Sequence, residues 1–369
     1  MDDRPGPVRA AVIGLGWAGS AIWLPRLRRH PAFDLVAAVD PAPRPDAAAA
    51  AASAGVPVLA TVEELNRERV DFAVVAVPNH LHSEVATRLL RRDVSVFVEK
   101  PVCLSAAEAD RLTEAESNGQ GVLVAGSAAR CRADVRRLYE LAGTVGPIRH
   151  IDLAWVRARG VPDGGGWFTQ RRLAGGGALM DLGWHLLDIV GPILGEVEFE
   201  QAVATTSDDF VHASDAAAAW RHHEDAPPSA DAAPIDVEDT VRSFLVTPAG
   251  TAVSLRASWA SHEPCDVTSI RVEGSAGTVH LRCTFGFSPN RLPSPVLTLL
   301  RDGEVVVAEV PPEPVGSEYD RQLDELPALL AEPATRGRSV TEAHRTIALI
   351  SRLYESARTR RTATPARRG

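Results

Sequence analysis

The sequence predicts two domains: an α/β domain with a doubly wound parallel sheet, and then an α+β domain whose mostly antiparallel sheet is open on one face. The 369 residues suffice for two domains of about 100–200 residues each. Up to about residue 145, short apolar runs alternate with helix-period segments, as in parallel sheets. From Ile148 onward, strands follow one another through turns instead of helices. We therefore expect domains over 1–145 and 146–358, and a disordered tail over 359–369.

Five short runs of apolar and β-branched residues predict the parallel sheet, because strands buried on both faces show no polar alternation. These runs are Val8–Ile13, Phe33–Val39, Val70–Val77, Val94–Val98 and Gly121–Ala125. Apolar residues at helical spacing predict helices over Ala18–His30, Ala47–Ala54, Thr61–Arg67, Leu81–Arg92, Ser105–Ser117 and Asp134–Leu141. Thr61 with Glu64, and Ser105 with Glu108, have the spacing of a capping box, which marks two helix starts.

The second domain is predicted to contain six strands, one interrupting helix and two closing helices. The strands are expected over Arg149–Val156, Glu196–Thr205, Val241–Thr247, Ala252–Trp259, Thr268–Glu273 and Thr278–Leu281. The helices are expected over Gly177–Val190, Tyr319–Leu330 and Val340–Arg358, and the C-terminal helix could pack back on the first domain. The stretch 208–236, rich in Ala, Pro and Asp, is interpreted as an insertion that bears on substrate size.

Charge and cysteine content restrict the possible partners and compartment. The formal net charge of −9 argues against nucleic acid and anionic membranes, because an acidic surface repels phosphate. The four cysteines form no C-x-x-C pair, which favours a reducing compartment. The first residues lack the pattern of a signal peptide, and no run of about 18 uncharged apolar residues could span a bilayer. We expect a cytoplasmic protein without a membrane partner.

A metal site is not expected, since no three potential ligands cluster in the sequence. The His222-His223 pair stands beside an acidic loop and is predicted to be exposed.

A glycine fingerprint follows the first predicted strand and begins the first predicted helix. Gly14 permits a tight turn, Gly16 lets the backbone approach a pyrophosphate, and Gly19 allows close packing of helix on strand. The diphosphate would lie at the helix N-terminus. We therefore expect a dinucleotide to contact Gly14, Gly16, Trp17, Ala18 and Gly19.

Asp40 ends the second predicted strand, where a carboxylate can accept hydrogen bonds from the ribose hydroxyls of the dinucleotide. It would repel the 2′-phosphate of NADP, so NAD is the expected cofactor. Arg44 could neutralise that phosphate, which leaves NADP as the alternative. A turn or capping role is the competing interpretation of Asp40.

Pro78, Asn79 and His82 follow the third predicted strand at its carboxyl end. Ligands of open α/β sheets bind beside such ends, so we expect these residues in the cofactor pocket. A turn with an asparagine cap is an equally good interpretation.

Glu99, Lys100 and Pro101 end the fourth predicted strand. Burying charges there is costly unless they are paired or used. The Lys100 ammonium could polarise a substrate oxygen beside a nicotinamide, and Pro101 would fix the turn that directs it. A surface lysine at a strand end is the alternative.

Asp181 and His185 are four residues apart, on one face of the helix that follows the glycine run Gly175–Gly177. The glycines would allow a ligand to approach closely. A histidine with a nearby carboxylate is suited to act as a general base, and a buried structural histidine is the alternative. In a dehydrogenation, His185 would accept the proton, Lys100 would stabilise the oxyanion, and Asp181 would orient His185 or a substrate hydroxyl. Lys100 and His185 must then converge on one face of the nicotinamide.

These motifs resemble the Gfo/Idh/MocA family, which includes glucose-fructose oxidoreductase and inositol dehydrogenase. The resemblance extends from about Val8 to about Arg358. It rests on the glycine fingerprint, on Pro78-Asn79-x-x-His82, on Glu99-Lys100-Pro101, and on the Gly175–Asp188 segment with Asp181 and His185. The segment Ile22–Leu27 is also similar to oxidoreductases of antibiotic gene clusters that act on nucleotide sugars.

The resemblance implies a Rossmann domain and Lys100, Asp181 and His185 as catalytic residues. It implies that Glu99 and Lys100 border the cofactor, and that Trp17 could lie beside the nicotinamide. We expect Trp167 and Arg171, just before the glycine run, to contact substrate. It further implies a homodimer or homotetramer formed through the C-terminal sheet.

The predicted function is an NAD-dependent oxidoreductase that acts on a ring alcohol or ketone of a sugar, sugar nucleotide or cyclitol. Two alternatives remain at this point. One is a ketoreductase that acts on a keto-deoxysugar nucleotide with NADPH. The other is a non-catalytic dinucleotide sensor, which would have no chemical need for Lys100, Asp181 and His185 together.

Overall fold

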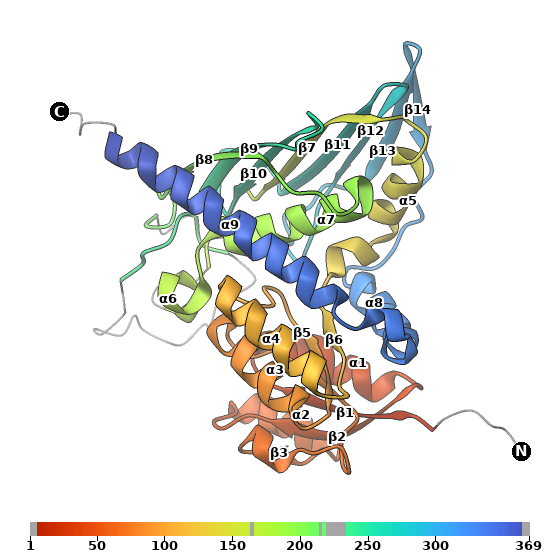
Figure 1. Cartoon of the computed structure of the whole chain (residues 1–369), viewed down its shortest axis with the longest axis vertical. Helices are drawn as coiled ribbons and strands as arrows, with labels where there is room; N and C mark the ends of the chain where they lie inside the picture. The colour runs from red at the N-terminus through yellow and green to blue at the C-terminus, as the bar shows by residue number, and fades with distance from the viewer. Residues whose placement is uncertain (1–5, 163–165, 214–215, 219–233, 364–369) are drawn as a thin grey trace, which may run out of the picture. The chain divides into compact units, whose positions relative to one another are not determined.

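The computed structural model describes residues 6–162, 166–213, 216–218 and 234–363 (Figure 1). The chain divides into two compact units, one drawn from Met1–Gly126 and Tyr319–Ile347, the other from Ser127–Glu318 and Ala348–Gly369. This division after Gly126 differs from the boundary expected at residue 145. The His222-His223 pair, residues 219–233 of the expected insertion and the end of the expected tail lie outside the described residues.

The first unit is built on a six-stranded parallel sheet with the order β3-β2-β1-β4-β5-β6. Its strands are β1 (Val8–Ile13), β2 (Phe33–Val39), β3 (Val58–Leu59), β4 (Phe72–Val75), β5 (Ser95–Val98) and β6 (Leu123–Ala125). The strand order reverses between β1 and β4, which confirms the doubly wound sheet. All four residues of β4 are buried, as its apolar sequence predicts.

The main helices of this unit are α1 (Leu24–Arg29), α2 (Pro45–Ser53), α3 (His82–Leu90) and α4 (Ala106–Asn118). A π-helical segment, η1 (Ala18–Trp23), precedes α1 within the helix predicted over Ala18–His30. The helix predicted over Thr61–Arg67 is reduced to the 3-10 turn η2 (Val62–Glu64), although its capping box is present. The backbone is already extended at Leu65, whose side chain is buried, so tertiary packing overrides the local helix signal.

The second unit contains an eight-stranded sheet with the order β14-β13-β12-β11-β7-β10-β9-β8. Its strands are β7 (Ile148–Val156), β8 (Gln201–Ser207), β9 (Thr240–Val246), β10 (Ala252–Ser258), β11 (Val267–Gly274), β12 (Gly277–Cys283), β13 (Val296–Arg301) and β14 (Glu304–Ala308). Only β7 and β10 pair in parallel, which confirms the mostly antiparallel sheet. β13 and β14 were not among the predicted strands.

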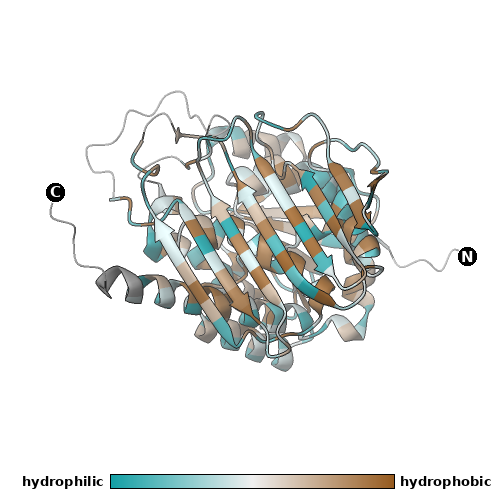
Figure 2. Cartoon of the chain, turned by 90° about the horizontal axis from the view of Figure 1, so that it is seen from above, coloured by the Kyte–Doolittle hydropathy of each residue, from teal (hydrophilic) through white to brown (hydrophobic). Residues whose placement is uncertain are grey.

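Helices α5 (Ala133–Ala142) and α7 (Trp184–Leu194) contact the sheet at β12 and β7. Figure 2 shows the other face, on which hydrophilic and hydrophobic residues share the strand surface. Val203 and Phe244 are cross-strand partners and are 38% and 44% exposed. These positions agree with a sheet that is open on one side.

Two long helices, α8 (Ser317–Ala331) and α9 (Arg338–Ala363), close the chain. In the first unit, the Ala125 N–H donates to Ser339 Oγ at 3.2 Å, and the Gly337 N–H donates to Glu116 Oε2 at 3.1 Å. The start of α9 therefore packs on the first unit. α9 continues beyond Arg358 to Ala363, so that part of the expected tail is helical.

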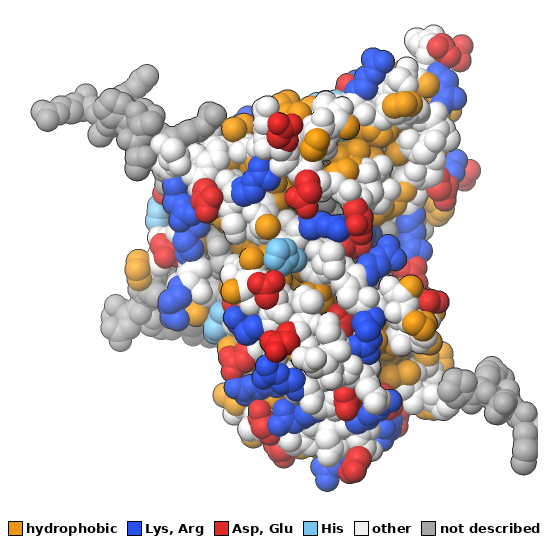
Figure 3. Space-filling view, viewed as in Figure 1, with side chains coloured by type: hydrophobic (Ala, Val, Ile, Leu, Met, Phe, Trp, Pro, Cys, Tyr) orange, Lys and Arg blue, Asp and Glu red, His pale blue; other side chains and the backbone are white. Residues whose placement is uncertain are grey.

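The helical stretch Arg171–Leu194 is long and apolar enough to cross a membrane by length and composition. Its apolar window is 72% buried within the protein, as in a core helix. Figure 3 shows acidic and basic side chains interspersed over both units on the face that it draws. The net charge is therefore not gathered into one patch on that face.

Candidate active site

The fingerprint glycines have three different environments. Gly14 has φ +89°, and a Cβ there would lie 2.7 Å from Ala76 O. A Cβ on Gly19 would lie 1.8 Å from Gly14 O, whereas a Cβ on Gly16 would have nothing within 4 Å. Gly14 and Gly19 thus pack the helix against the sheet, and the space beside Gly16 suits a diphosphate. Trp17, next to Gly16, is 42% exposed.

Asp40 lies directly after β2 and holds the fingerprint loop. Its Oδ2 accepts a hydrogen bond from the Leu15 N–H at 2.8 Å, and its Oδ1 accepts one from the Ala42 N–H at 2.9 Å. Arg44, which could have received a 2′-phosphate, donates to the exposed carboxylate of Asp46 at 3.2 Å. The carboxylate is therefore at the predicted strand end and beside the fingerprint.

Asn79 and His82 follow β4 in the short turn η3 (Asn79–Leu81) and at the start of α3. Both side chains are buried, and His82 is only 1% exposed. The His82 Nε2 lies 2.7 Å from Val77 O, and its Nδ1 lies 2.7 Å from Pro101 O. Both ring nitrogens lie against main-chain carbonyls of the unit, and contact of His82 with the cofactor stays a prediction. Burial lowers the pKa of His82, and the two carbonyl contacts oppose that shift.

Glu99 follows β5 and fixes the backbone at Lys100. Its Oε1 accepts a hydrogen bond from Trp23 Nε1 at 2.7 Å, and its Oε2 accepts one from the Lys100 N–H at 3.2 Å. Burial raises the pKa of the Glu99 carboxyl, and the Trp23 hydrogen bond opposes this shift. Lys100 follows directly, at the carboxyl edge shared with Asp40 and Asn79. This edge is where open α/β sheets bind ligands.

In the second unit, Asp181 lies in the π-helical segment η6 (Leu179–Gly183), and His185 lies at the start of α7. The Asp181 Oδ2 accepts a hydrogen bond from Trp259 Nε1 at 2.9 Å and lies 3.9 Å from an Arg157 nitrogen. The His185 ring lies 5.5 Å from the Trp155 ring, between centroids. Lys100 belongs to the other unit, so its convergence with His185 stays a prediction.

The glycine run before this helix is explained by packing within the protein, whereas we expected it to allow the close approach of a ligand. Gly175 ends α6 (Arg171–Ala174) with φ +86°. A Cβ on Gly176 would lie 1.9 Å from Tyr354 Oη, and one on Gly177 would lie 1.7 Å from Glu238 O. The groups that approach Gly176 and Gly177 are therefore protein groups and not a ligand.

Glu238 is a buried residue that the sequence analysis missed. Its Oε1 accepts hydrogen bonds from the Leu179 N–H at 3.0 Å and from Tyr354 Oη at 2.8 Å, and the Gly177 N–H lies 3.2 Å from both oxygens. Burial raises the pKa of Glu238, and the Leu179 N–H opposes this shift. Glu238 thus holds the start of the helix that contains Asp181 and His185. An acidic pair, Glu238-Asp239, directly before the strand β9, whose residues alternate between buried and exposed, was the available signal.

The two expected substrate contacts lie near this helix start. Arg171 pairs with Glu238 at 3.4 Å and lies over the Tyr354 ring at 4.8 Å, so its guanidinium already has partners. The Trp167 ring lies 5.0 Å from the Phe168 ring. Phe168 in turn lies 6.0 Å from Trp259, the partner of Asp181.

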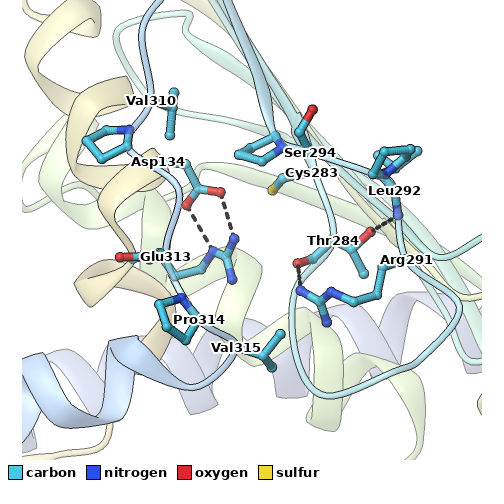
Figure 4. A pocket seen from close by; sticks show the side chains of 14 residues that line it. Asp134, Cys283, Thr284, Arg291, Leu292, Ser294, Val310, Glu313, Pro314 and Val315 are labelled. Atoms are coloured by element: carbon cyan, nitrogen blue, oxygen red, sulfur yellow. Dashed lines mark hydrogen bonds and ion pairs between the residues drawn. The ribbon is translucent and has the colours of Figure 1, made fainter.

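A cavity of about 130 Å³ lies elsewhere in the second unit, between α5 and the loops after β12 and β14 (Figure 4). Arg132 donates to both oxygens of Asp134 at 2.9 and 2.7 Å, and Arg291 donates to Thr284 O at 2.9 Å. No residue predicted for the site lines this cavity. Its charged groups have protein partners, so we place the candidate site at Asp181 and His185 instead.

The fold and the fingerprint geometry define a Rossmann domain of the dinucleotide-binding class. The model of the oxidoreductase family with an NAD-binding Rossmann fold matches residues 8–127. The model of the GFO/IDH/MocA C-terminal domain matches residues 133–280. The chain is 57% identical over 350 residues to the putative UDP-kanosamine synthase oxidoreductase subunit of Amycolatopsis mediterranei (strain S699), covering 95% of this chain and 96% of the relative. The chain therefore belongs to the Gfo/Idh/MocA family of oxidoreductases.

Two solved structures have the same fold along almost the whole chain. GenD2 from gentamicin A biosynthesis, in complex with NAD, matches with a TM-score of 0.74 and 23% identity over 96% of this chain and 95% of that one. KijD10, a 3-ketoreductase from Actinomadura kijaniata in complex with NADP and TDP-benzene, matches with a TM-score of 0.73 and 20% identity over 95% and 98%. The family and cofactor class expected from the motifs are confirmed.

Proposed function

We propose that the protein is an NAD-dependent dehydrogenase that oxidises the C3 hydroxyl of a UDP-hexose to a ketone. The supporting observation is the 57% identity, over 95% of the chain, to a putative UDP-kanosamine synthase oxidoreductase subunit. Kanosamine is a hexose with an amino group at the carbon where glucose has its C3 hydroxyl. That carbon must reach the oxidation level of a carbonyl before an amine can replace the oxygen. An oxidoreductase acting at C3 fits this requirement.

Lys100 supports the assignment to hydride-transfer chemistry. It is the only lysine among the 39 Lys and Arg residues of the chain, so the other 38 are arginines. Arginine would supply the same charge, but a guanidinium spreads that charge over a planar group, whereas the lysine ammonium concentrates it at one compact point. A single ammonium group beside the end of β5 supports a role for which a guanidinium does not suffice.

In this proposal each side chain has one task. When bound, NAD supplies the hydride acceptor for the substrate carbon. His185 accepts the hydroxyl proton, and Lys100 stabilises the negative charge that develops on the oxygen. Asp181 has its Oδ2 on Trp259 and directs its other oxygen to His185 or to a substrate hydroxyl. These tasks require Lys100 and His185 to lie on the same side of the substrate carbon.

The preference for NAD over NADP is part of the proposal. The Asp40 carboxylate lies at the end of β2 beside the fingerprint, where it would repel a 2′-phosphate. Arg44 is paired with Asp46, which lessens its capacity to neutralise that phosphate. We expect kcat/KM to be higher with NAD than with NADP.

The test uses a large amount of enzyme, so that a single turnover is detectable. The protein is incubated with UDP-glucose and NAD, and the reaction is quenched with borodeuteride. The position of the deuterium in the sugar is then determined by NMR. We expect deuterium at C3, and much less at C3 with methyl glucoside, which lacks the nucleotide and has no free aldehyde for borodeuteride to reduce. Deuterium at another carbon would overturn the position. Activity only as NADPH-dependent reduction of the 3-keto sugar would show a ketoreductase, and NAD binding without turnover would show a sensor.

Location and assembly are also proposed. None of the four cysteines is in a disulfide, which supports a reducing compartment such as the cytoplasm. The exposed Val203 and Phe244 on the open sheet face support a homo-oligomer that buries this face. Light scattering on the wild type and on Phe244→Glu tests the oligomer, and a monomeric wild type would contradict it.

A further inference from the structure

We propose that His82 is a positioning residue for Lys100, because its buried imidazole connects the main-chain carbonyls of the two loops that follow β4 and β5. The proposal rests on the function proposed for Lys100. It gives His82 a task different from contact with the cofactor.

The two loops leave adjacent strands at the same edge of the sheet. β4 and β5 pair in parallel up to Val75 and Val98, and the Glu99 N–H still donates to Val75 O at 3.0 Å. Beyond this point, the imidazole of His82 lies between Val77 O and Pro101 O, 2.7 Å from each. His82 therefore continues the connection between the strands at the place where the sheet ladder ends.

The contact at Pro101 acts on Lys100 through the chain itself. The Lys100 N–H is held by the Glu99 carboxylate at 3.2 Å, and the carbonyl of the next residue, Pro101, is held by His82. The backbone of Lys100 is thus fixed on both sides. The Val77 contact fixes the other loop, whose residues Ala76 and Val77 lie against Gly14 of the fingerprint. One imidazole therefore couples the fingerprint side of the site to the lysine side.

A purely space-filling role would not require these atoms. An apolar side chain could fill the same volume, but it would remove the ring N–H and leave the carbonyl that accepts from it without a partner, at about 1–3 kcal/mol for a buried group. A role as a cofactor ligand is not consistent with 1% exposure and two engaged ring nitrogens. A neutral ring has one N–H, so only one of the two carbonyls accepts a hydrogen bond from it. The other carbonyl accepts one only when the ring is protonated.

The single lysine permits a direct test. Protein labelled with ¹³C at the lysine Cε has one labelled lysine signal, which reports on Lys100 without relying on activity. We compare the wild type with His82→Phe, which keeps a ring but has no N–H, and with His82→Gln, which retains an amide donor. Leu89→Ala, in the buried face of the same helix, is the control for lost stability.

We expect His82→Phe to shift the Lys100 signal and to lower kcat on the order of 10- to 100-fold, with KM for NAD within about threefold. His82→Gln should recover part of the wild-type Lys100 signal and part of the wild-type kcat, and Leu89→Ala should change neither of these two quantities. Folded His82 variants with an unchanged lysine signal and unchanged kcat would overturn the proposal. If Lys100→Ala keeps its turnover while His82→Phe still moves the lysine signal, the proposed function fails and the positioning role stands.

Discussion

Trp259 donates its indole N–H to the Oδ2 of Asp181 at 2.9 Å, so a fully buried aromatic residue after β10 fixes one oxygen of the carboxylate expected at the active site. A hydrogen bond to a charged group contributes about 1.5–3 kcal/mol. The contact joins the sheet of the second unit to the helix that contains His185.

Replacing Trp259 by Phe should therefore release Asp181. We expect kcat to fall on the order of tenfold, with a smaller change in KM, because the carboxylate is no longer held in one orientation. Steady-state kinetics with UDP-glucose measures the change in kcat and the change in KM separately. Trp184→Phe, also buried in this unit, is the control for lost aromatic volume. Equal losses of kcat in both variants would mean that packing alone, and not the hydrogen bond, is responsible.

Lys100→Arg should lose as much turnover as Lys100→Ala, on the order of 10²-fold or more, although it retains the charge. The physical reason is that a guanidinium is larger and planar, so it cannot place the compact charge of an ammonium at the substrate oxygen. NAD affinity, measured by fluorescence titration, should stay within about threefold. Arg91→Lys at the exposed end of α3 is the matched surface exchange and should be neutral. Near-normal turnover in Lys100→Arg would remove the argument from the single lysine.

Gly16→Ala and Gly19→Ala should fail in different ways. A Cβ at residue 16 meets nothing within 4 Å, so Gly16→Ala should keep the wild-type Tm and lose NAD affinity. A Cβ at residue 19 would lie 1.8 Å from Gly14 O, so Gly19→Ala should unfold at a much lower temperature. Thermal melts with and without NAD separate the two effects. If Gly16→Ala binds NAD normally, the diphosphate does not approach at this residue.

Glu238→Gln should disturb the start of the helix that contains Asp181 and His185. The glutamine NH₂ group would face the Gly177 N–H, so one acceptor contact becomes a contact between two donors. We expect a loss of about 1–3 kcal/mol in the free energy of unfolding and a lower kcat. Denaturant titration gives the first quantity and steady-state kinetics the second. Tyr354→Phe, which removes only one partner of Glu238, should show a smaller loss in both.

The stability of the protein should decrease in mild acid because of His82. Burial lowers the pKa of His82 below its ordinary 6.5, and the nearby Lys100 and His80 act in the same direction. The unfolded chain then binds a proton at a higher pH than the folded chain, so stability is lost as pH falls below about 6.5. Between about pH 7 and about pH 5, the Tm of the wild type should fall more than that of His82→Gln. Parallel decreases in the two proteins would show that other groups govern this range.

The local sequence determined most elements of the first unit, with β3 and the shortened helix after Thr61 as exceptions. The strands Val8–Ile13 and Phe33–Val39 have the predicted bounds, and Ser105 caps α4 through the Glu108 N–H as its spacing indicated. Hydrophobic periodicity and capping depend on residues that are close in sequence, so one sequence is enough to recognise them. The family motifs are also local in sequence, and they indicated which side chains to expect in the active site.

Only the tertiary structure decided what surrounds those side chains. Gly176 and Gly177 make room for Tyr354 and Glu238, and His82 meets Val77 and Pro101 across two loops. β14 is a strand because β13 lies beside it, although Val305 and Val307 are more than half exposed. Tyr354 and Glu238 are distant in sequence from the glycines that they meet, and such contacts depend on how the whole chain packs and not on any local period.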